Sequence, residues 1–436
     1  MLSTIVAAPF AFSPSTATAD GPCDITGKAG NPCVAAHSTT RALFAAYDGP
    51  LYQVTRSSDG KSADVGVLKA GGFANIATHE TFCAKLDCVI AIVYDQSPQG
   101  NHLGQRHQLV PASRHKIHVG DHSTPVYGMW FEPGYGYHVD NTTGIATGNE
   151  EESIFAVMSG THFNGGCCFD YGNSETDDRD DGCGTMEAIY FGNAHWNGNT
   201  GAGDTGPWVG ADLEQGMYYG GGEKTQVNNQ SKPLPHEFVS LYLRGRTDGF
   251  MLKGGDATAG KLETMYDGPR PDRTIAGFCG STDSYQPMRK QGAIILATGG
   301  DNSNSAQGKF YEGIMVTGTT TDATDEAVQA NIIGVKYKNI PAPPATALGC
   351  YKDAADHDLP ISASKGMVSS DALQECGELC ASYKYFALEY GKECRCGDSY
   401  GKYGKSSDPA TDCNMPCEND ESVTCGGNYK ENVYSH

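Results

Sequence analysis

Two adjacent cysteines, Cys167 and Cys168, stand out among the reactive side chains of the sequence, within the segment Gly165–Asn173. In an oxidising compartment, neighbouring cysteines bond to each other only through a strained eight-membered ring. Such a ring is rigid, flat and weakly polar, which suits packing against the face of a sugar, and strained geometry tends to collect where ligands are held. The alternative is that each cysteine bonds to a different distant partner, and the pair alone favours neither.

Two carboxylates, Asp212 and Glu214, lie two residues apart in the segment Pro207–Gln215. If this segment is a strand, both side chains point to the same face. Because two neighbouring carboxylates repel each other, they need a cleft, a cation or a ligand to hold them together. A solvated outer face is the alternative for a generic Asp-x-Glu, but the apolar and aromatic neighbours here favour a site.

A third acid, Asp301, follows Gly299 and Gly300 directly after the apolar segment Gly292–Ala297. This pattern predicts a strand that ends in a glycine-rich turn and presents an acid. The alternative is an Asx turn in which Asp301 only caps its own loop. Together with Glu214, Asp301 supplies what glycoside hydrolysis requires, which is one carboxylate nucleophile and one carboxylic acid as proton donor.

The composition indicates a secreted protein stabilised by disulfides. The chain has 436 residues, an even count of 16 cysteines and a formal net charge of −21, and cysteine-rich chains belong to oxidising compartments. The negative charge argues against nucleic acid or an anionic membrane as partner. Residues 1–19 hold a short apolar run and a small-residue cleavage pattern, which we interpret as a signal peptide. Asn141 and Asn229 begin sequons and are expected glycosylation sites.

A change of composition at residues 339–347 predicts a linker, because three prolines among small residues make an extended spacer. Eight cysteines precede this segment and are widely spread, whereas eight follow it and are crowded. A small domain with so many cysteines is held together by disulfides, since its core is too small to do so alone. We therefore expect one domain at residues 20–338 and a second at residues 348–436.

Within the first domain, strands are the recurrent signal, and we expect an all-β fold, an antiparallel β-sandwich with peripheral helices. The expected helices lie in Ser38–Phe44 and Thr324–Ile333. Continuous apolar, β-branched runs predict buried strands at Cys88–Tyr94, Ser153–Met158, Glu237–Leu243 and Gly292–Ala297.

Several motifs, in order along the chain, closely resemble glycoside hydrolase family 54 over residues 21–338. The motifs that carry this resemblance are Cys33–Leu43, Tyr94–Ser97 with Gly100–Leu103, Gly166–Asn173, Met186–Tyr190 and Gly299–Asn304. The members of that family are α-L-arabinofuranosidases. The resemblance therefore implies a concanavalin-like β-sandwich and a retaining mechanism through a covalent arabinosyl-enzyme intermediate.

The resemblance also implies residue roles. Glu214 is similar to the family's nucleophile and Asp301 to its general acid/base. The implied sugar-contacting residues are Cys167, Cys168, Asp212, Trp196, Gln215 and Gly300. Gln215-Gly216 departs from the family, which usually has two asparagines touching the sugar, and this puts hydrogen bonding to the arabinose hydroxyls in doubt.

The implied disulfides are Cys23–Cys33, Cys83–Cys88 and Cys167–Cys168. In the first domain this leaves Cys183 and Cys279. A free exposed thiol is a liability in a secreted protein, so a Cys183–Cys279 bridge is the economical hypothesis. Two buried, unreactive thiols are the competing one.

The second domain resembles a WSC domain, a small disulfide-rich α+β module that binds carbohydrate and is found in fungal wall proteins and enzymes. The motifs that carry this resemblance are Gly349–Asp353, Cys376–Cys380, Tyr385–Gly391, Glu393–Gly397, Cys413–Cys417 and Cys425–Gly427. Cys-x-Cys and Cys-x₃-Cys spacings also occur at metal sites, but a secreted context favours disulfides.

The functional expectation is a secreted, exo-acting, retaining α-L-arabinofuranosidase that trims side chains of arabinoxylan or arabinan. The alternative is a non-catalytic sandwich lectin that binds wall polysaccharide through both domains. We expect arabinose-containing plant polysaccharides as partners. We expect the WSC domain to bind an unidentified wall polysaccharide and to associate the protein with the cell wall. We expect a monomer with no cofactor and no metal, and with no nucleic-acid or membrane partner.

Overall fold

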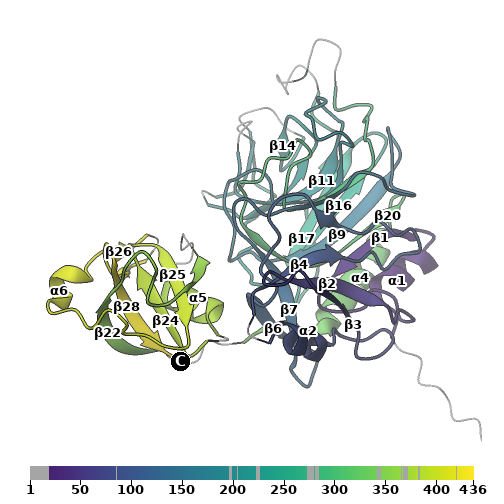
Figure 1. Ribbon diagram of the computed structural model, residues 1–436. Coiled ribbons are helices and arrows are strands. Elements are labelled where there is room, and N and C mark those ends of the chain that lie inside the picture. Colours follow the sequence, from purple (N-terminus) through teal and green to yellow (C-terminus); the bar gives the residue numbers. More distant parts are fainter. Residues whose placement is uncertain are drawn as a thin grey trace, which may run out of the picture.

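The computed structural model describes residues 19–84, 86–195, 199–203, 205–221, 226–272, 279, 284–340, 345–364, 366, 372–381, 383–418 and 420–436. The chain forms a large strand-rich unit and a small C-terminal unit (Figure 1). Apart from Ala19, the expected signal peptide lies outside the described residues.

The first sheet of the large unit contains nine antiparallel strands. Their bounds are β1 (Cys33–Ser38), β6 (His115–Val119), β7 (Thr124–Phe131), β9 (Glu152–Met158), β16 (Val239–Gly245), β17 (Phe250–Asp256), β18 (Glu263–Gly268), β20 (Gly308–Thr317) and β21 (Lys338–Asn339). The order is β18-β17-β16-β9-β20-β7-β6-β21, with β1 paired to β20. Every residue of β9 and β16 is buried, as their apolar sequences predict.

The second sheet contains seven antiparallel strands and packs on the first. Their bounds are β5 (Gly104–Gln105), β8 (Tyr137–Val139), β10 (Asp170–Ser174), β11 (Glu187–Gly192), β13 (Trp208–Asp212), β14 (Met217–Tyr218) and β19 (Ala293–Leu296). Their order is β14-β13-β11-β10-β19-β8-β5. Between the sheets, the ring of Tyr171 lies 5.3 Å from that of Phe310. The two packed antiparallel sheets confirm the expected β-sandwich.

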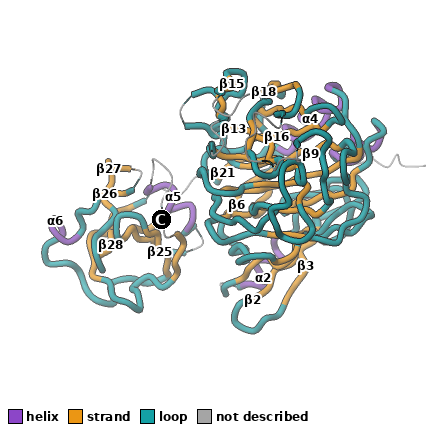
Figure 2. The backbone as a smooth tube through the Cα atoms, turned by 90° about the horizontal axis from the view of Figure 1, so that it is seen from above, coloured by secondary structure: helices purple, strands orange, loops and turns teal. Residues whose placement is uncertain are grey.

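The remaining elements of the large unit lie around the sandwich, and its helices are peripheral in Figure 2. They are β2 (Pro50–Arg56), β3 (Ser62–Gly66), β4 (Cys88–Val93), β12 (Thr200–Gly201), β15 (Val227–Asn228), α1 (Pro22–Lys28), α2 (Ile76–Cys83) and α4 (Asp322–Val335). Strands β3-β2-β4 form a separate sheet, and β12 pairs with β15 in parallel. Within the ranges that the structure describes, no helix is both long and apolar enough to cross a bilayer.

Helix α4 confirms the expected helix at Thr324–Ile333 and is fixed to the first sheet by ion pairs. Its N-cap, Thr321, accepts a hydrogen bond from the N–H of Thr324. The buried carboxylate of Asp325 lies 2.7 Å from Arg244 on β16 and 2.8 Å from Lys253 on β17. These two cations compensate the charge that α4 buries against the strands.

The prediction of a helix at Ser38–Phe44 is wrong. Ser38 is the last residue of β1 and pairs with Glu312 of β20, and residues 39–44, all described, form no helix. The hydroxyl of Thr39 donates to the carbonyl of Tyr127 at 2.8 Å. Hydroxyl side chains that bond distant backbone in this way compete with the local hydrogen bonds of a helix.

A second ion pair, between buried Lys309 and partly buried Glu237, ties the segment before β16 to β20. Nζ of Lys309 lies 2.9 Å from Oε1 of Glu237. Burial alone would raise the pKa of Glu237, but the charges of Lys309 and His115 outweigh it and lower that pKa to about 2. Glu237 is therefore a carboxylate whose ionisation stabilises the folded sandwich.

The small unit is built on a five-stranded antiparallel sheet of order β22-β28-β24-β25-β23. Its elements are β22 (Thr346–Lys352), β23 (Ile361–Ser364), β24 (Tyr385–Glu389), β25 (Glu393–Gly397), β26 (Pro416–Cys417), β27 (Asp420–Thr424), β28 (Lys430–Ser435), α5 (Ala372–Leu379) and α6 (Pro409–Asp412). Strand β22 begins inside the linker expected at 339–347, so the spacer is shorter than its composition suggests.

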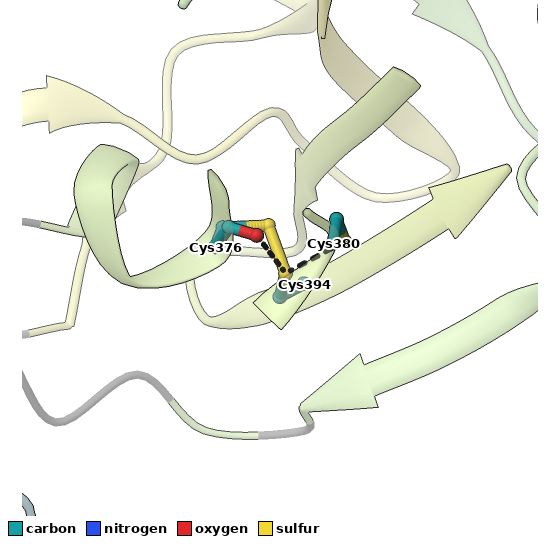
Figure 3. Close-up of side chains that lie close together, drawn as sticks. All are labelled: Cys376, Cys380 and Cys394. Atoms are coloured by element: carbon teal, nitrogen blue, oxygen red, sulfur yellow. Dashed lines mark hydrogen bonds between the residues drawn. A yellow bond between two sulfur atoms is a disulfide. The ribbon is translucent and has the colours of Figure 1, made fainter. Parts of the chain in front are cut away.

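Disulfides join the elements of the small unit to one another. The four bridges are Cys350–Cys413, Cys376–Cys394, Cys380–Cys396 and Cys417–Cys425. Cys376 and Cys380 are four residues apart and share a helix face, whereas Cys394 and Cys396 are two apart and share a strand face. Helix α5 and the residue after it are therefore bonded to β25 by two disulfides. Figure 3 shows Cys376, Cys380 and Cys394 together, with the sulfurs of Cys380 and Cys394 3.7 Å apart. Because these sulfurs are bonded in disulfides, this cysteine cluster offers no thiolate to a metal.

Candidate active site

An open cleft of about 470 Å³ lies over one end of the second sheet. Four segments form it: the segment before β10, the acidic segment 177–181 between β10 and β11, the turn between β13 and β14, and the loop after β19. The lining residues are Cys167, Cys168, Asp180, Asp212, Glu214, Gln215, Gly216, Met217, Gly299, Asp301 and Ser303. The structure therefore brings together the vicinal cysteines and all three acids that the sequence analysis selected.

Glu214 lies in a tight turn rather than on a strand, which corrects the same-face argument for Asp212 and Glu214. Strand β13 ends at Asp212, and the N–H of Leu213 donates to the carbonyl of Gly216 at 3.1 Å. The two central residues, Glu214 and Gln215, have φ values of 59° and 54°. Each left-handed non-glycine residue costs about 1–2 kcal/mol, and such strain collects at functional sites.

Asp212 is held by the backbone of that turn and faces the vicinal disulfide. Its Oδ1 accepts the N–H of Glu214 at 3.0 Å, and its Oδ2 lies 3.5 Å from Sγ of Cys168. Burial raises the pKa of Asp212 to about 7, although the hydrogen bond from Glu214 lowers it. Asp212 is therefore positioned against both the turn that carries Glu214 and one wall of the cleft.

Asp301 lies at the exposed rim of the cleft in an Asx turn. Its Oδ1 accepts the N–H of Ser303 at 2.8 Å, and the N–H of Gly299 donates to the carbonyl of Ser303 at 2.8 Å. Asp301 therefore fits both interpretations, since it caps an Asx turn and that turn also presents it to the cleft. The turn fixes one carboxylate oxygen, which limits how far the side chain can rotate.

The vicinal cysteines are bonded to each other. The N–H of Ser305 donates to the carbonyl of Cys167 at 2.6 Å, which joins this segment to the loop after Asp301. A Cβ atom on Gly299 would lie 3.4 Å from both sulfurs. The disulfide is therefore packed against the backbone of the Asp301 loop and forms a rigid wall of the cleft.

Two further carboxyl groups, Asp170 and Glu175, lie behind the cleft and were not selected from the sequence. Both are fully buried. Asp170 lies against Asp212, and neither of its oxygens receives a donor from a described residue. Oε1 of Glu175 accepts the hydroxyl of Thr185 at 2.5 Å. The one signal that could have found Asp170 was its place inside the motif Gly166–Asn173. Its burial, however, depends on the packing of both sheets.

Burial and mutual repulsion raise the pKa of each buried carboxyl group at this end of the sheet. The pKa of Glu175 rises to about 7, and burial followed by the charge of Asp212 raises that of Asp170. Burial raises the pKa of Glu214, and the charges of Asp212 and Glu175 add to the effect. Such a cluster keeps protons at pH values where isolated carboxyls have lost them.

The other expected sugar contacts have different outcomes. The side-chain amide of Gln215 donates to both oxygens of Asp180, at 2.8 and 2.9 Å. Gly300 lies directly against Glu175, where a Cβ atom would overlap Oε2. Trp196 lies outside the described residues. Asp180, which comes from the acidic segment 177–181, is an additional lining residue that the sequence analysis did not assign to the site.

The structure also places the remaining cysteines and both sequons. It contains the bridges Cys23–Cys33, Cys83–Cys88 and Cys183–Cys279. The last bridge joins Cys183, three residues after Asp180, to Cys279, 96 positions later. Asn141 and Asn229 are both exposed, so the structure leaves their side chains accessible to glycosylation.

A two-sheet antiparallel sandwich with clustered carboxyls and a rigid wall in one cleft defines a class of protein, the β-sandwich glycosidases and the sugar-binding domains related to them. Comparison with protein families identifies the chain more closely. Residues 22–338 match the family described as "Alpha-L-arabinofuranosidase B, catalytic", and residues 347–427 match the WSC domain. The chain belongs to this arabinofuranosidase family, glycoside hydrolase family 54.

Curated relatives agree with the family match. The chain is 46% identical over 338 residues to a probable alpha-L-arabinofuranosidase B of Aspergillus terreus, a match that covers 75% of this chain and 64% of the relative. It is also 46% identical to an alpha-L-arabinofuranosidase of Hypocrea jecorina, over 76% of this chain and 65% of the relative. The chain thus spans slightly less than two thirds of the length of these relatives.

Solved structures share the fold. An arabinofuranosidase complexed with arabinofuranosyl-alpha-1,2-xylobiose is 35% identical, with a TM-score of 0.72, and covers 88% of this chain and 86% of that one. A GH54 arabinofuranosidase soaked with a cyclic sulfate inhibitor is 39% identical, with a TM-score of 0.69, and covers 78% of this chain and 71% of that one.

Proposed function

We propose that the protein is an exo-acting, retaining α-L-arabinofuranosidase that removes terminal arabinofuranosyl side chains from arabinoxylan or arabinan. One observation carries the proposal: Glu214 and Asp301 line one cleft beside a vicinal disulfide wall. A relative binds arabinofuranosyl-xylobiose, which supports arabinose-decorated xylan as a substrate class.

In the first step, Asp301 donates its proton to the glycosidic oxygen while a carboxylate oxygen of Glu214 attacks C1 of the arabinose. The C1–O bond to the leaving group breaks, and an arabinosyl ester of Glu214 forms. In the second step, the carboxylate of Asp301 takes a proton from water, and that water attacks C1 and releases Glu214. Two displacements at C1 retain the configuration.

This mechanism requires Glu214 to be ionised while its neighbours keep their protons. Burial raises the pKa of Glu214 as well, so its ionisation depends on its neighbours. Every proton held by Asp170, Glu175 or Asp212 removes a negative charge near Glu214 and favours its ionisation. The positive charge that develops on the sugar in the transition state further favours an ionised Glu214. Asp212 accepts the backbone N–H of Glu214 and thereby positions the residue whose carboxylate attacks.

We propose that the small unit attaches the enzyme to wall polysaccharide through one group of tyrosines. The rings of Tyr351 and Tyr385 lie 5.0 and 4.6 Å from the ring of Tyr400, and all three are partly exposed. Partly exposed aromatic rings offer flat apolar area to sugar faces together with a polar hydroxyl. Retention on insoluble xylan or wall glucan, compared between wild type and Tyr400→Ala, tests this role.

We further propose that the protein is secreted, that it acts as a monomer outside the cell and that the small unit holds it at the cell wall. Eight disulfides support an oxidising destination. Fractionation of the native host into medium, wall and cell extract tests the destination, and sedimentation of the purified protein tests the monomeric state.

Release of arabinose from an aryl α-L-arabinofuranoside tests the proposed activity. Wild type should turn the substrate over, and Glu214→Gln should lose at least about 10³-fold in kcat, because the amide is a poor nucleophile. Asp248→Asn is the matched control, since this acid is 84% exposed. The lectin alternative predicts sugar binding without release, and wild-type turnover by Glu214→Gln would overturn the assignment.

A further inference from the structure

The small unit buries a second cluster of carboxyl groups, away from the active-site cleft. Its members are Asp353, directly after β22, Asp358 in the following loop, Glu389 at the end of β24 and Glu431 in β28. All four are at most 8% exposed. Buried carboxylates require compensation by cations, protons or hydrogen-bond donors.

Strand register forces two of these acids together. Glu389 and Glu431 are direct partners in the antiparallel pairing of β24 with β28. Directly opposed residues have Cβ atoms only about 4.5–5.5 Å apart, and like charges in this position destabilise a sheet. The pairing is fixed over five successive residue pairs, so a shift of register cannot relieve the repulsion without exposing the core face.

The donors available nearby serve the other three acids. Oε2 of Glu389 accepts Nε of Arg395 at 2.9 Å. Asp353 accepts the N–H of Asp358 and lies 2.5 Å from Nδ1 of His357. Oδ1 of Asp358 accepts the N–H of Lys402 at 2.8 Å, and its Oδ2 accepts another backbone N–H.

Glu431 receives none of these donors. Its side chain is fully buried, and neither carboxylate oxygen receives a donor from the described residues. The charged groups that act on it are the carboxylates of Asp353, Asp358 and Glu389, with Asp358 within hydrogen-bonding reach. A fully buried acid beside three other acids must either keep a proton or be compensated by a cation.

We propose that the small unit binds a divalent cation, calcium in the first place, through the carboxylates of Glu431, Glu389 and Asp353. Ligand atoms of Asp353, His357 and Glu389 lie within 4.8 Å of one another, close enough to share one cation. Glu431 is not part of that group, but it directly opposes Glu389 across the strand pair. Oxygen ligands favour a hard cation, and calcium tolerates irregular oxygen geometry better than magnesium does. This proposal departs from the sequence-based expectation of no metal.

A bound cation would lock β22, β24 and β28 together at the end of the sheet where Asp353 leaves β22. Its function would be to hold the loop 353–358 in one conformation. The proposal is independent of the arabinofuranosidase activity, since all its ligands lie in the small unit.

Isothermal titration of the full-length protein, stripped with EDTA and desalted, tests the site with calcium chloride alone. We expect one site with a dissociation constant in the micromolar to millimolar range, as known extracellular and sensor sites show. Glu431→Gln keeps the shape of the side chain but removes its charge, and it should weaken calcium binding at least about 10-fold. Asp356→Asn, which changes an exposed acid of the same loop, is the matched control and should bind within about twofold of wild type.

Hydrogen exchange supplies a second readout. Calcium should slow exchange of the peptides that contain β24 and β28 in wild type, and not in Glu431→Gln. Absence of binding up to about 10 mM calcium would overturn the proposal, because a buried proton on Glu431 would then account for the cluster. Binding by Glu431→Gln equal to that of wild type would overturn it as well, since the site would lie elsewhere.

Discussion

Gly300→Ala tests how tightly the loop that carries Asp301 is packed on its buried neighbour. A Cβ atom at this position would overlap Oε2 of Glu175, far inside the 3.0 Å that real Cβ atoms keep, and would also lie 3.3 Å from Ser174. The Glu175 side chain has little room to move away, because it is fully buried and accepts the hydroxyl of Thr185. Either that hydrogen bond breaks or the loop shifts outward.

Overpacking of this kind costs about 1–3 kcal/mol of stability. A displacement of about 1 Å at the adjacent Asp301 would lower kcat/KM by about 10- to 100-fold, since catalysis depends on the placement of the proton donor. Initial rates on 4-nitrophenyl α-L-arabinofuranoside and urea unfolding measure the two effects. Gly104→Ala is the control, because a Cβ there meets nothing within 4 Å. Activity and stability of Gly300→Ala equal to those of wild type would refute this packing.

Three other substitutions probe the wall, a bridge and a buried charge. Cys168→Ser should raise KM more than it lowers the unfolding midpoint, since a bridge between neighbours constrains the unfolded chain little; equal KM values would contradict a sugar-facing wall. Cys279→Ser opens the bridge to Cys183 and should cost about 4–5 kcal/mol, because that bridge closes a long loop, and an unchanged urea midpoint would contradict it. The pKa of Glu237 is about 2 in the folded protein and about 4.3 when unfolded. Glu237→Gln should therefore lose about 3 kcal/mol at pH 6, and its deficit should shrink as pH falls from about 4.5 to 2; a deficit independent of pH would contradict this.

The sandwich could be predicted from the sequence because its signals are local. Apolar runs such as Ser153–Met158 read as buried strands, and they occupy the centre of the first sheet. The helix at Thr324–Ile333 carries its own cap at Thr321. The helix expected at Ser38–Phe44 failed because pairing of β1 with β20, a contact between distant segments, decided its conformation.

The site could be predicted only in part. Residue spacing selected Asp212, Glu214 and Asp301, motif resemblance gave their roles, and the cleft contains all three. The proposed alternation along a strand was wrong, since Glu214 lies in a turn with left-handed backbone that no local pattern announces. Asp170 and Glu175 were missed because a buried acid resembles an exposed one in sequence, and only the packing of two sheets distinguishes them.

Identification of the residue that carries the arabinosyl group tests the central claim most directly. Asp301→Ala should slow the second displacement while an activated leaving group preserves the first, so the intermediate should accumulate with 4-nitrophenyl α-L-arabinofuranoside. Acid quenching, proteolysis and mass spectrometry should then find one arabinosyl group on the peptide that contains Glu214, and none in the variant that also carries Glu214→Gln. An arabinosyl group on any other residue, or a first-formed product of inverted configuration, would contradict the account.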